Sequence, residues 1–245
     1  MSIETCCPVL ELRQYTLHPG QRDTLIQLFD REFVESQEQL GMRVIGQFRD
    51  LDKPDRFVWL RGFHNMEVRD TALRAFYGGP VWAANSKAAN ATMIDASNVL
   101  LLRPARTGSG FRVDGLARAP LGTTKSPQAL VVATICDLGT APASDFIDFF
   151  DNDVMPAMAD TVAARFVTDA SANTFPALPV RTGENAFVWF STFKTSTEYE
   201  THLARVDRSP HWRDEIYPKL RARLVSDPEV LRLSPTARSL LTYRI

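Results

Sequence analysis

The sequence has 245 residues, of which 44% are hydrophobic and 23% charged, and its formal net charge is -1. This composition is typical of a folded globular protein and excludes a disordered or fibrous chain. A charge near zero does not attract nucleic acid or anionic lipid, and no stretch of about 18 apolar residues is present to insert into a bilayer. We therefore expect a cytoplasmic protein with no nucleic-acid partner and no membrane insertion.

The first part of the chain predicts the element order βαββαβ. Residues that favour strands and alternate between two faces predict β-strands at residues 9–16, 43–49, 56–63 and 98–103. Apolar residues at helical spacing predict helices at residues 23–40, 66–76 and 81–91, with a break at Gly78-Gly79-Pro80 between the last two.

The same order returns in the second part. Phe57-Val58-Trp59 recurs at an offset of 130 as Phe187-Val188-Trp189, and Trp82, which follows Pro80 by two residues, recurs at the same offset as Trp212. The corresponding strands are predicted at residues 130–136, 162–169, 186–193 and 230–235, and the helices at residues 144–159, 197–206 and 211–224. Residues 171–185 are predicted to form a surface loop. We divide the chain into a first repeat (1–105), a linker (106–128) and a diverged second repeat (129–245).

The element order specifies the fold class, α+β. A βαββαβ unit forms a four-stranded antiparallel sheet with both helices on one face, the ferredoxin-like arrangement. The other face of each sheet needs a partner, and a second copy in the same chain can supply it. We therefore predict two tandem ferredoxin-like repeats that form a pseudo-dimeric α/β barrel.

The opening strand and turn carry a family resemblance. Glu11, Arg13, Tyr15, Pro19 and Gly20 form the pattern E-x-R-x-Y-x-x-x-P-G, which, with the Phe-Val-Trp strand and the Pro-Val-Trp helix, resembles the NIPSNAP family. The resemblance covers nearly all of the first repeat, whereas the second repeat keeps only the Trp strand and Pro-x-Trp. It implies a member of the dimeric α/β-barrel superfamily, which includes oxygenases, isomerases and plain binders.

Polar side chains gather on one face of two strands in the first repeat. Glu11, Arg13 and Tyr15 share a face of one strand, and Trp59 and Arg61 share a face of another. We expect this face to look into the barrel and the apolar opposite faces to meet the helices. The candidate ligand-binding residues are Glu11, Arg13, Tyr15, Trp59, Arg61 and His64, with the guanidinium groups holding an anion or a carbonyl oxygen. The alternative is that the charged residues form cross-strand ion pairs and the aromatic residues pack at an interface.

Three functions follow from this pattern. The first is a NIPSNAP-like protein that binds a small hydrophobic or acidic molecule in the barrel. The second is a cofactor-independent monooxygenase- or isomerase-type enzyme of the same superfamily, and the third is a purely structural barrel. The partners are thus a small-molecule ligand and, as a further option, a second copy in a homo-oligomer. Because Thr134, Cys136 and Ser191 stand where the first repeat has Arg13, Tyr15 and Arg61, we expect the second repeat to serve chiefly as a wall.

The cysteines and histidines do not predict a cofactor. Cys6 and Cys7 are adjacent and Cys136 stands alone, so we expect no disulfide framework. The four histidines lack the spacing of metal ligands, and we predict no metal and no cofactor.

Overall fold

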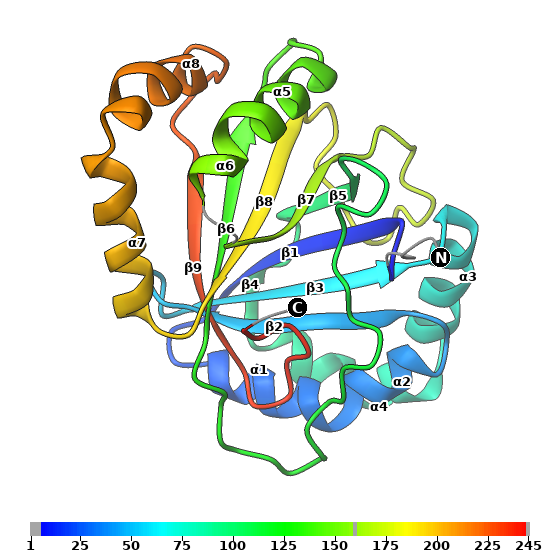
Figure 1. Ribbon diagram of the computed structural model, residues 1–245. Coiled ribbons are helices and arrows are strands. Elements are labelled where there is room, and N and C mark those ends of the chain that lie inside the picture. Colours follow the sequence, from blue (N-terminus) through cyan, green and yellow to red (C-terminus); the bar gives the residue numbers. More distant parts are fainter. Residues whose placement is uncertain (1–5, 159–160, 244–245) are drawn as a thin grey trace.

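The computed structural model describes residues 6–158 and 161–243 (Figure 1). Its strands are β1 (Val9–Leu17), β2 (Arg43–Asp50), β3 (Arg56–Phe63), β4 (Met93–Asp95), β5 (Val99–Pro104), β6 (Leu130–Asp137), β7 (Val162–Thr168), β8 (Ala186–Phe193) and β9 (Glu229–Pro235). Its α-helices are α1 (Arg22–Leu28), α2 (Val34–Glu38), α3 (Met66–Tyr77), α4 (Pro80–Asn90), α5 (Ala143–Phe149), α6 (Met155–Ala157), α7 (Ser196–Arg208) and α8 (Tyr217–Arg221). Three π-helical turns, which sequence periodicity does not distinguish from α-helix, are η1 (Phe29–Phe33), η2 (Phe150–Val154) and η3 (Trp212–Ile216).

Eight of these strands form a closed antiparallel barrel. The sheet order is β3-β2-β9-β6-β8-β7-β5-β1-β4, and a further pairing of β3 with β1 closes the ring, leaving β4 as a short edge beside β1. Two seams join the repeats, β2 with β9 and β5 with β7. The predicted pseudo-dimeric α/β barrel is confirmed, and β4 is the one described strand that the sequence patterns did not predict.

The strand registers make the two repeats equivalent residue by residue. Trp59 pairs with Arg13 across β3 and β1, and Trp189 pairs with Thr134 across β8 and β6. The strands that pair with β3 and β8 in the hairpins, β2 and β7, each contain a register shift. In β2 the shift follows the pairing of Val44 with Arg61, and in β7 it follows the equivalent pairing of Val162 with Ser191. Thr134 and Ser191 therefore occupy the positions of Arg13 and Arg61.

The two faces of the strands are the reverse of the predicted orientation. The apolar side chains of the first repeat, among them Leu10, Leu12, Val58 and Leu60, fill the barrel interior together with apolar residues of the second repeat. The face that carries Tyr15 and Trp59 instead packs against the helices. The reason is that the barrel interior offers only apolar neighbours, whereas on the helix side Arg69 of α3 and Gln37 of α2 hydrogen-bond to the charged residues. The alternation of side chains along a strand assigns residues to two faces of the sheet, but it does not show which face the helices cover.

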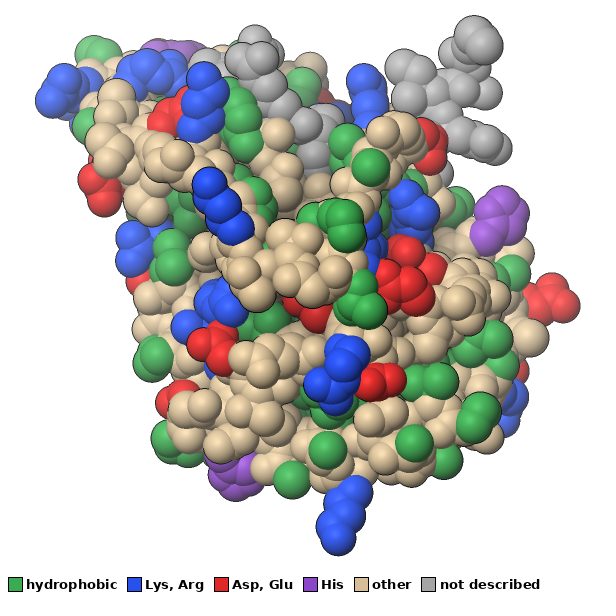
Figure 2. All heavy atoms as spheres, turned by 90° about the horizontal axis from the view of Figure 1, so that it is seen from below, with side chains coloured by type: hydrophobic (Ala, Val, Ile, Leu, Met, Phe, Trp, Pro, Cys, Tyr) green, Lys and Arg blue, Asp and Glu red, His purple; other side chains and the backbone are tan. Residues whose placement is uncertain are grey.

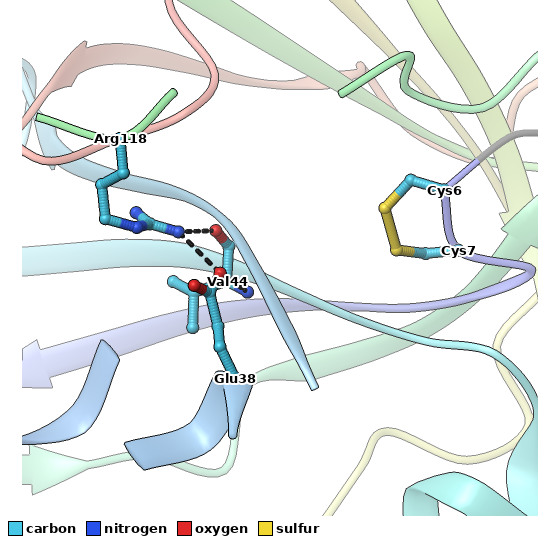
Figure 3. The surroundings of a disulfide bond; sticks show 5 residues. All are labelled: Cys6, Cys7, Glu38, Val44 and Arg118. Atoms are coloured by element: carbon cyan, nitrogen blue, oxygen red, sulfur yellow. Dashed lines mark hydrogen bonds and ion pairs between the residues drawn. A yellow bond between two sulfur atoms is a disulfide. The ribbon is translucent and has the colours of Figure 1, made fainter. Parts of the chain in front are cut away.

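The linker is part of the barrel. Phe111 and Val113 are buried in its core, and the Phe111 ring lies 5.2 Å from that of Phe166 and 4.9 Å from that of Phe190. Farther along, Arg118 donates to the Glu38 carboxylate at 2.8 Å and to the backbone carbonyl of Val44 (Figure 3). The linker, residues 106–128, thus fills part of the barrel core and contacts the first repeat, beyond the role of a tether.

Replacing Phe111 with alanine should therefore lower the free energy of unfolding by about 3–5 kcal/mol, because a buried ring leaves a cavity in the barrel core. Urea denaturation measures the change. Leu121→Ala, at a linker residue that is 61% exposed, is the control and should change the free energy of unfolding by less than about 0.5 kcal/mol. Equal effects of the two substitutions would mean that the linker does not fill the barrel.

The cysteine prediction is corrected at the start of β1. Cys6 and Cys7 are joined by a disulfide (Figure 3). Adjacent cysteines close a small ring within two residues, so their spacing alone did not exclude a bond. The pair lies close to β3, where a Cβ at Gly62 would lie 2.3 Å from the Cys7 sulfur, so that strand needs a glycine. Cys136 is free and buried, and burial raises the pKa of its thiol to about 12.

The predicted surface loop between β7 and β8 lies on the first repeat. The Phe175 ring stacks on Tyr77 of α3 at 5.8 Å, and Thr174 and Asn173 accept hydrogen bonds from the Arg69 guanidinium. The second repeat therefore covers part of the helical layer of the first.

The face formed by α1, α2, α4 and the linker carries interspersed acidic and basic side chains (Figure 2), in keeping with the net charge of -1. Within residues 6–158 and 161–243, no helix is long and apolar enough to cross a membrane. In the same described part of the chain, no group of three or more His, Cys, Asp or Glu side chains is placed to hold a metal ion.

Candidate functional site

A buried cluster of one carboxylate and three guanidinium groups lies between the barrel and the helices of the first repeat. The Glu11 Oε2 atom accepts from Arg13 Nη1 at 2.8 Å and from Arg61 Nη2 at 2.6 Å, and Oε1 accepts from Arg69 Nε at 2.8 Å. All four side chains are 0% exposed. The predicted grouping of Glu11, Arg13 and Arg61 is thus present, on the helix side of the sheet.

Arg69 is the member that sequence reasoning missed. The N-cap residue Asn65, whose Oδ1 accepts from the Val68 backbone N–H at 2.8 Å, starts α3 and places Arg69 in its first turns. Arg69 then lies on the buried face of α3 with Ala72, Leu73 and Phe76. An arginine within an apolar helical stripe was the signal that could have found it.

The aromatic candidates surround the guanidinium of Arg13. Tyr15 Oη accepts from Arg13 Nε at 2.9 Å. The Arg13 guanidinium carbon lies 5.4 Å from the centre of the Tyr15 ring and 5.5 Å from that of Trp59. His64, in contrast, is exposed at the turn after β3 and lies outside the cluster.

The cluster determines its own protonation states. Burial alone would raise the pKa of Glu11, but Arg61, Arg13 and Arg69 together outweigh burial and hold that pKa well below its usual range. Burial opposes the charge on Arg13, yet Tyr15 and Glu11 raise the pKa of that guanidinium above its ordinary value. Burial also raises the pKa of the Tyr15 phenol, so Tyr15 is a neutral hydroxyl.

Stability should therefore depend on Glu11 below about pH 4.5. A carboxyl whose folded-state pKa is depressed contributes stability that is complete above its unfolded pKa, ordinarily 4.5, and is lost as the pH falls toward the folded value. We expect the free energy of unfolding of the wild type to approach that of Glu11→Gln as the pH falls from 6 to 3. Urea denaturation across this range tests it, and a difference that stays constant with pH would show that Glu11 is not ionised in the folded protein.

A small cavity adjoins the cluster. It has a volume of about 30 Å³ and is lined mainly by aromatic and aliphatic side chains, and Tyr15, Trp59, Tyr77 and Gln37 are among its lining residues. Among described residues, the buried Trp59 Nε1 and Arg13 Nη2 atoms have no hydrogen-bond acceptor. Trp82 packs on Phe33, Phe76 and Tyr77, as expected for a side chain that anchors its helix.

A larger pocket occupies the equivalent place in the second repeat. There Val132, Thr134, Ser191 and Tyr199 stand at the positions of Glu11, Arg13, Arg61 and Arg69, so all four charges are absent. The pocket has a volume of about 260 Å³. Its lining is mostly apolar and aromatic: Val132, Thr134, Met158, Trp189, Ser191, Phe193, Tyr199, His202, Leu203, Val206, Asp207, Trp212, Tyr217, Leu220, Pro228 and Val230. The sequence predicted that the second repeat serves chiefly as a wall of a site in the first repeat, whereas the structure gives the second repeat a pocket of its own.

The helix α7 shapes this second-repeat pocket. Thr195, the counterpart of Asn65, caps α7 by accepting from the Glu198 backbone N–H at 3.1 Å. From that start Tyr199, His202 and Val206 face the sheet at helical spacing. Leu203, Tyr217 and Val230 line the pocket while 41–46% exposed, so it is open to solvent.

Comparisons with known proteins agree with this architecture. Residues 10–108 match the profile of the NIPSNAP family. A search of curated proteins found no match. The structure is similar over 98% of its length to a "putative monooxygenase" from Lactobacillus acidophilus NCFM (100% of that chain, 14% identity, TM-score 0.56).

Two further solved structures share the fold over nearly the whole chain. One is a "putative monooxygenase" from Fusobacterium nucleatum (98% of each chain, 9% identity, TM-score 0.58). The other is an anthrone oxidase-like protein (97% of this chain and 96% of that one, 12% identity, TM-score 0.55). At these identities the similarity establishes the fold alone. Residues 10–108, which span most of the first repeat, are thus similar to the NIPSNAP family and form one half of a two-repeat α/β barrel.

Proposed function

We propose that this chain binds a small, neutral and largely apolar molecule in the second-repeat pocket. The observation that carries the proposal is the opened pocket of about 260 Å³ at the position where the first repeat holds its charged cluster. Its walls include Trp189, Phe193 and Trp212, and Thr134 and Ser191 add two hydroxyl groups. A concave, mostly apolar site with a few polar groups is the usual form of a small-molecule site.

His202, which lines the pocket, adds a second requirement for the ligand, a hydrogen-bond acceptor. Its Nδ1 lies 3.3 Å from Arg205 Nη2, and because a guanidinium only donates, Nδ1 is the acceptor. Burial, with a smaller effect from Arg205, lowers the pKa of His202, so the ring is neutral near pH 7 and carries its hydrogen on Nε2. His202 is thus a hydrogen-bond donor, which suits a ligand with a carbonyl, ether or phenol oxygen.

This arrangement favours binding over the alternative of a cofactor-independent monooxygenase or isomerase. A general base at Nε2 needs the other tautomer, whose Nδ1–H would point at Arg205. One structural neighbour is named an anthrone oxidase-like protein, and this name supplies an aromatic ketone as the compound class for the test.

The test compares 1-tetralone, a neutral aromatic ketone, with tetralin, which lacks the carbonyl. Calorimetric titration should show that the wild type prefers tetralone and that His202→Phe weakens tetralone binding about three- to tenfold without weakening tetralin binding, since one neutral hydrogen bond is lost. Ser191→Leu, which places a larger side chain in the pocket floor where the ring would lie, should block binding of both. Trp59→Phe in the first repeat is the control and should leave both affinities unchanged.

Binding that survives Ser191→Leu would place the site elsewhere. The enzyme alternative has its own readout, oxygen uptake when the protein is mixed with anthrone in air. Uptake above the buffer rate that is lost in Ser191→Leu would replace the binding proposal with an oxygenase.

A further inference from the structure

The first-repeat cluster has more positive charge than its own residues balance. Three guanidinium groups face one carboxylate, and within the described residues their only ion pairs are those with Glu11. At 0% exposure, solvent does not screen the remaining two positive charges. Buried charge without a partner is costly, so binding of an anion beside these guanidinium groups would lower that cost.

Some hydrogen-bond donors in and beside the cluster have no acceptor among the described residues. Arg61 Nη1 donates to Gln37 at 2.8 Å, and Arg69 Nη1 donates to the loop between β7 and β8. Arg13 Nη2, Arg69 Nη2 and Trp59 Nε1, in contrast, are buried and have no acceptor among the described residues. Of these donors, Arg13 Nη2 and Trp59 Nε1 belong to adjacent side chains, because the Arg13 guanidinium carbon lies 5.5 Å from the centre of the Trp59 ring. Tyr15 accepts from Arg13 Nε, which leaves its hydroxyl hydrogen to donate.

We propose that the first repeat binds a small oxyanion, of the size of formate or nitrate, beside Arg13, Trp59 and Tyr15. Two of these residues line the cavity of about 30 Å³, and Arg13 hydrogen-bonds to one of them and lies against the ring of the other. A volume of this size admits a small anion but not a sugar acid or an aromatic acid. A guanidinium with an indole N–H and a phenol suits the planar array of oxygens in such an anion.

The protonation states support this role. The neutral phenol of Tyr15 can donate, and Arg13 keeps its charge because its pKa lies above the ordinary value. The site is also covered. Tyr77 lines the cavity and carries Phe175 of the second repeat on its outer face. The anion site is independent of the second-repeat pocket, because the two are lined by different residues.

The experiment titrates sodium formate and, separately, sodium nitrate into the full chain while sodium gluconate keeps the ionic strength constant. Gluconate is too large for the cavity, and formamide is the neutral analogue of formate. We expect the melting temperature to rise to saturation with formate or nitrate and not with formamide. Comparing formate with nitrate shows whether the natural ligand is a carboxylate or an inorganic oxyanion.

Variants locate the effect. Arg13→Met removes the charged donor but leaves Glu11 paired with Arg61 and Arg69, and it should weaken formate binding about ten- to a hundredfold. Trp59→Phe removes only the indole N–H and should weaken binding about threefold or more, whereas Trp189→Phe, its counterpart in the second repeat, should leave binding unchanged. If Arg13→Met fails to fold, Tyr15→Phe and Trp59→Phe still decide the question.

A rise in melting temperature that gluconate matches, or that Trp59→Phe and Trp189→Phe leave equally intact, would overturn the proposal. Because tetralone binding is measured in the other repeat, failure of the anion site leaves the proposed function standing, and the converse also holds.

Discussion

Replacing Glu11 with glutamine should lower the free energy of unfolding by at least about 3–5 kcal/mol, the usual cost of removing one partner from a buried ion pair. Here the cost falls at or above that range because Glu11 is the shared partner of Arg13, Arg61 and Arg69. Glutamine keeps the size of the side chain and removes only the charge. Such a loss is a large part of the stability of an ordinary domain, about 5–15 kcal/mol, and urea denaturation at pH 7 measures it.

The control is a carboxylate on the outer face of α3. Asp70 pairs with Arg74 at 2.9 Å, but both side chains are partly exposed, so Asp70→Asn should cost less than about 1 kcal/mol. Saturating formate should not rescue Glu11→Gln fully, because the variant loses the oxygen that binds Arg61 and Arg13. Similar losses in Glu11→Gln and Asp70→Asn would mean that the guanidinium cluster is solvated.

Separating the repeats should have the second large effect. The first repeat by itself exposes the edges of β2 and β5 and the apolar face that fills the barrel. Open strand edges and a bare apolar face promote association. We therefore expect residues 1–121, produced alone, to dimerise or aggregate on size-exclusion chromatography.

A cleavable full-length chain is the control for this result. A protease site at Gly122 cuts the linker beyond Phe111 and Arg118. Gly122 has a positive φ of 85°, and a Cβ added there would have no neighbour within 4 Å, so the position has room for an inserted site. The two fragments should stay together after cleavage, held by both seams and by the linker contacts. A stable monomer of residues 1–121 would contradict the prediction that the halves complete one barrel.

The internal sequence repeat made the fold predictable, but the sequence predicted the residues of the first-repeat cluster only in part. The shared Phe-Val-Trp strands predicted the equivalence of Trp59 and Trp189, which the strand registers confirm. The grouping of Glu11, Arg13 and Arg61 followed from the period of two along a strand and the antiparallel pairing of neighbours. Strand periodicity and hairpin pairing can therefore predict contacts only between residues on the same strand or in the same hairpin.

The remainder depends on tertiary packing. Arg69 approaches Glu11 from a helix, and Thr174 approaches Arg69 from the other repeat, so neither contact has a local pattern. The orientation of the strands was wrong because closure of the barrel, which alternation does not encode, decides which face is enclosed. The pocket of the second repeat exists because its residues at the positions of Glu11, Arg13 and Arg61 are smaller and uncharged. A cavity that results from several smaller side chains together has no pattern that can be recognised in a single sequence.

The covalent join between the two halves has a consequence for how such a barrel can change. In a symmetric homodimer each substitution occurs twice, so the two sites stay identical. In this chain Arg61 and Ser191 occupy equivalent positions but are encoded separately. One half can therefore keep a closed, charged interior while the other opens toward apolar compounds, and each chemistry can be altered by mutation without altering the other.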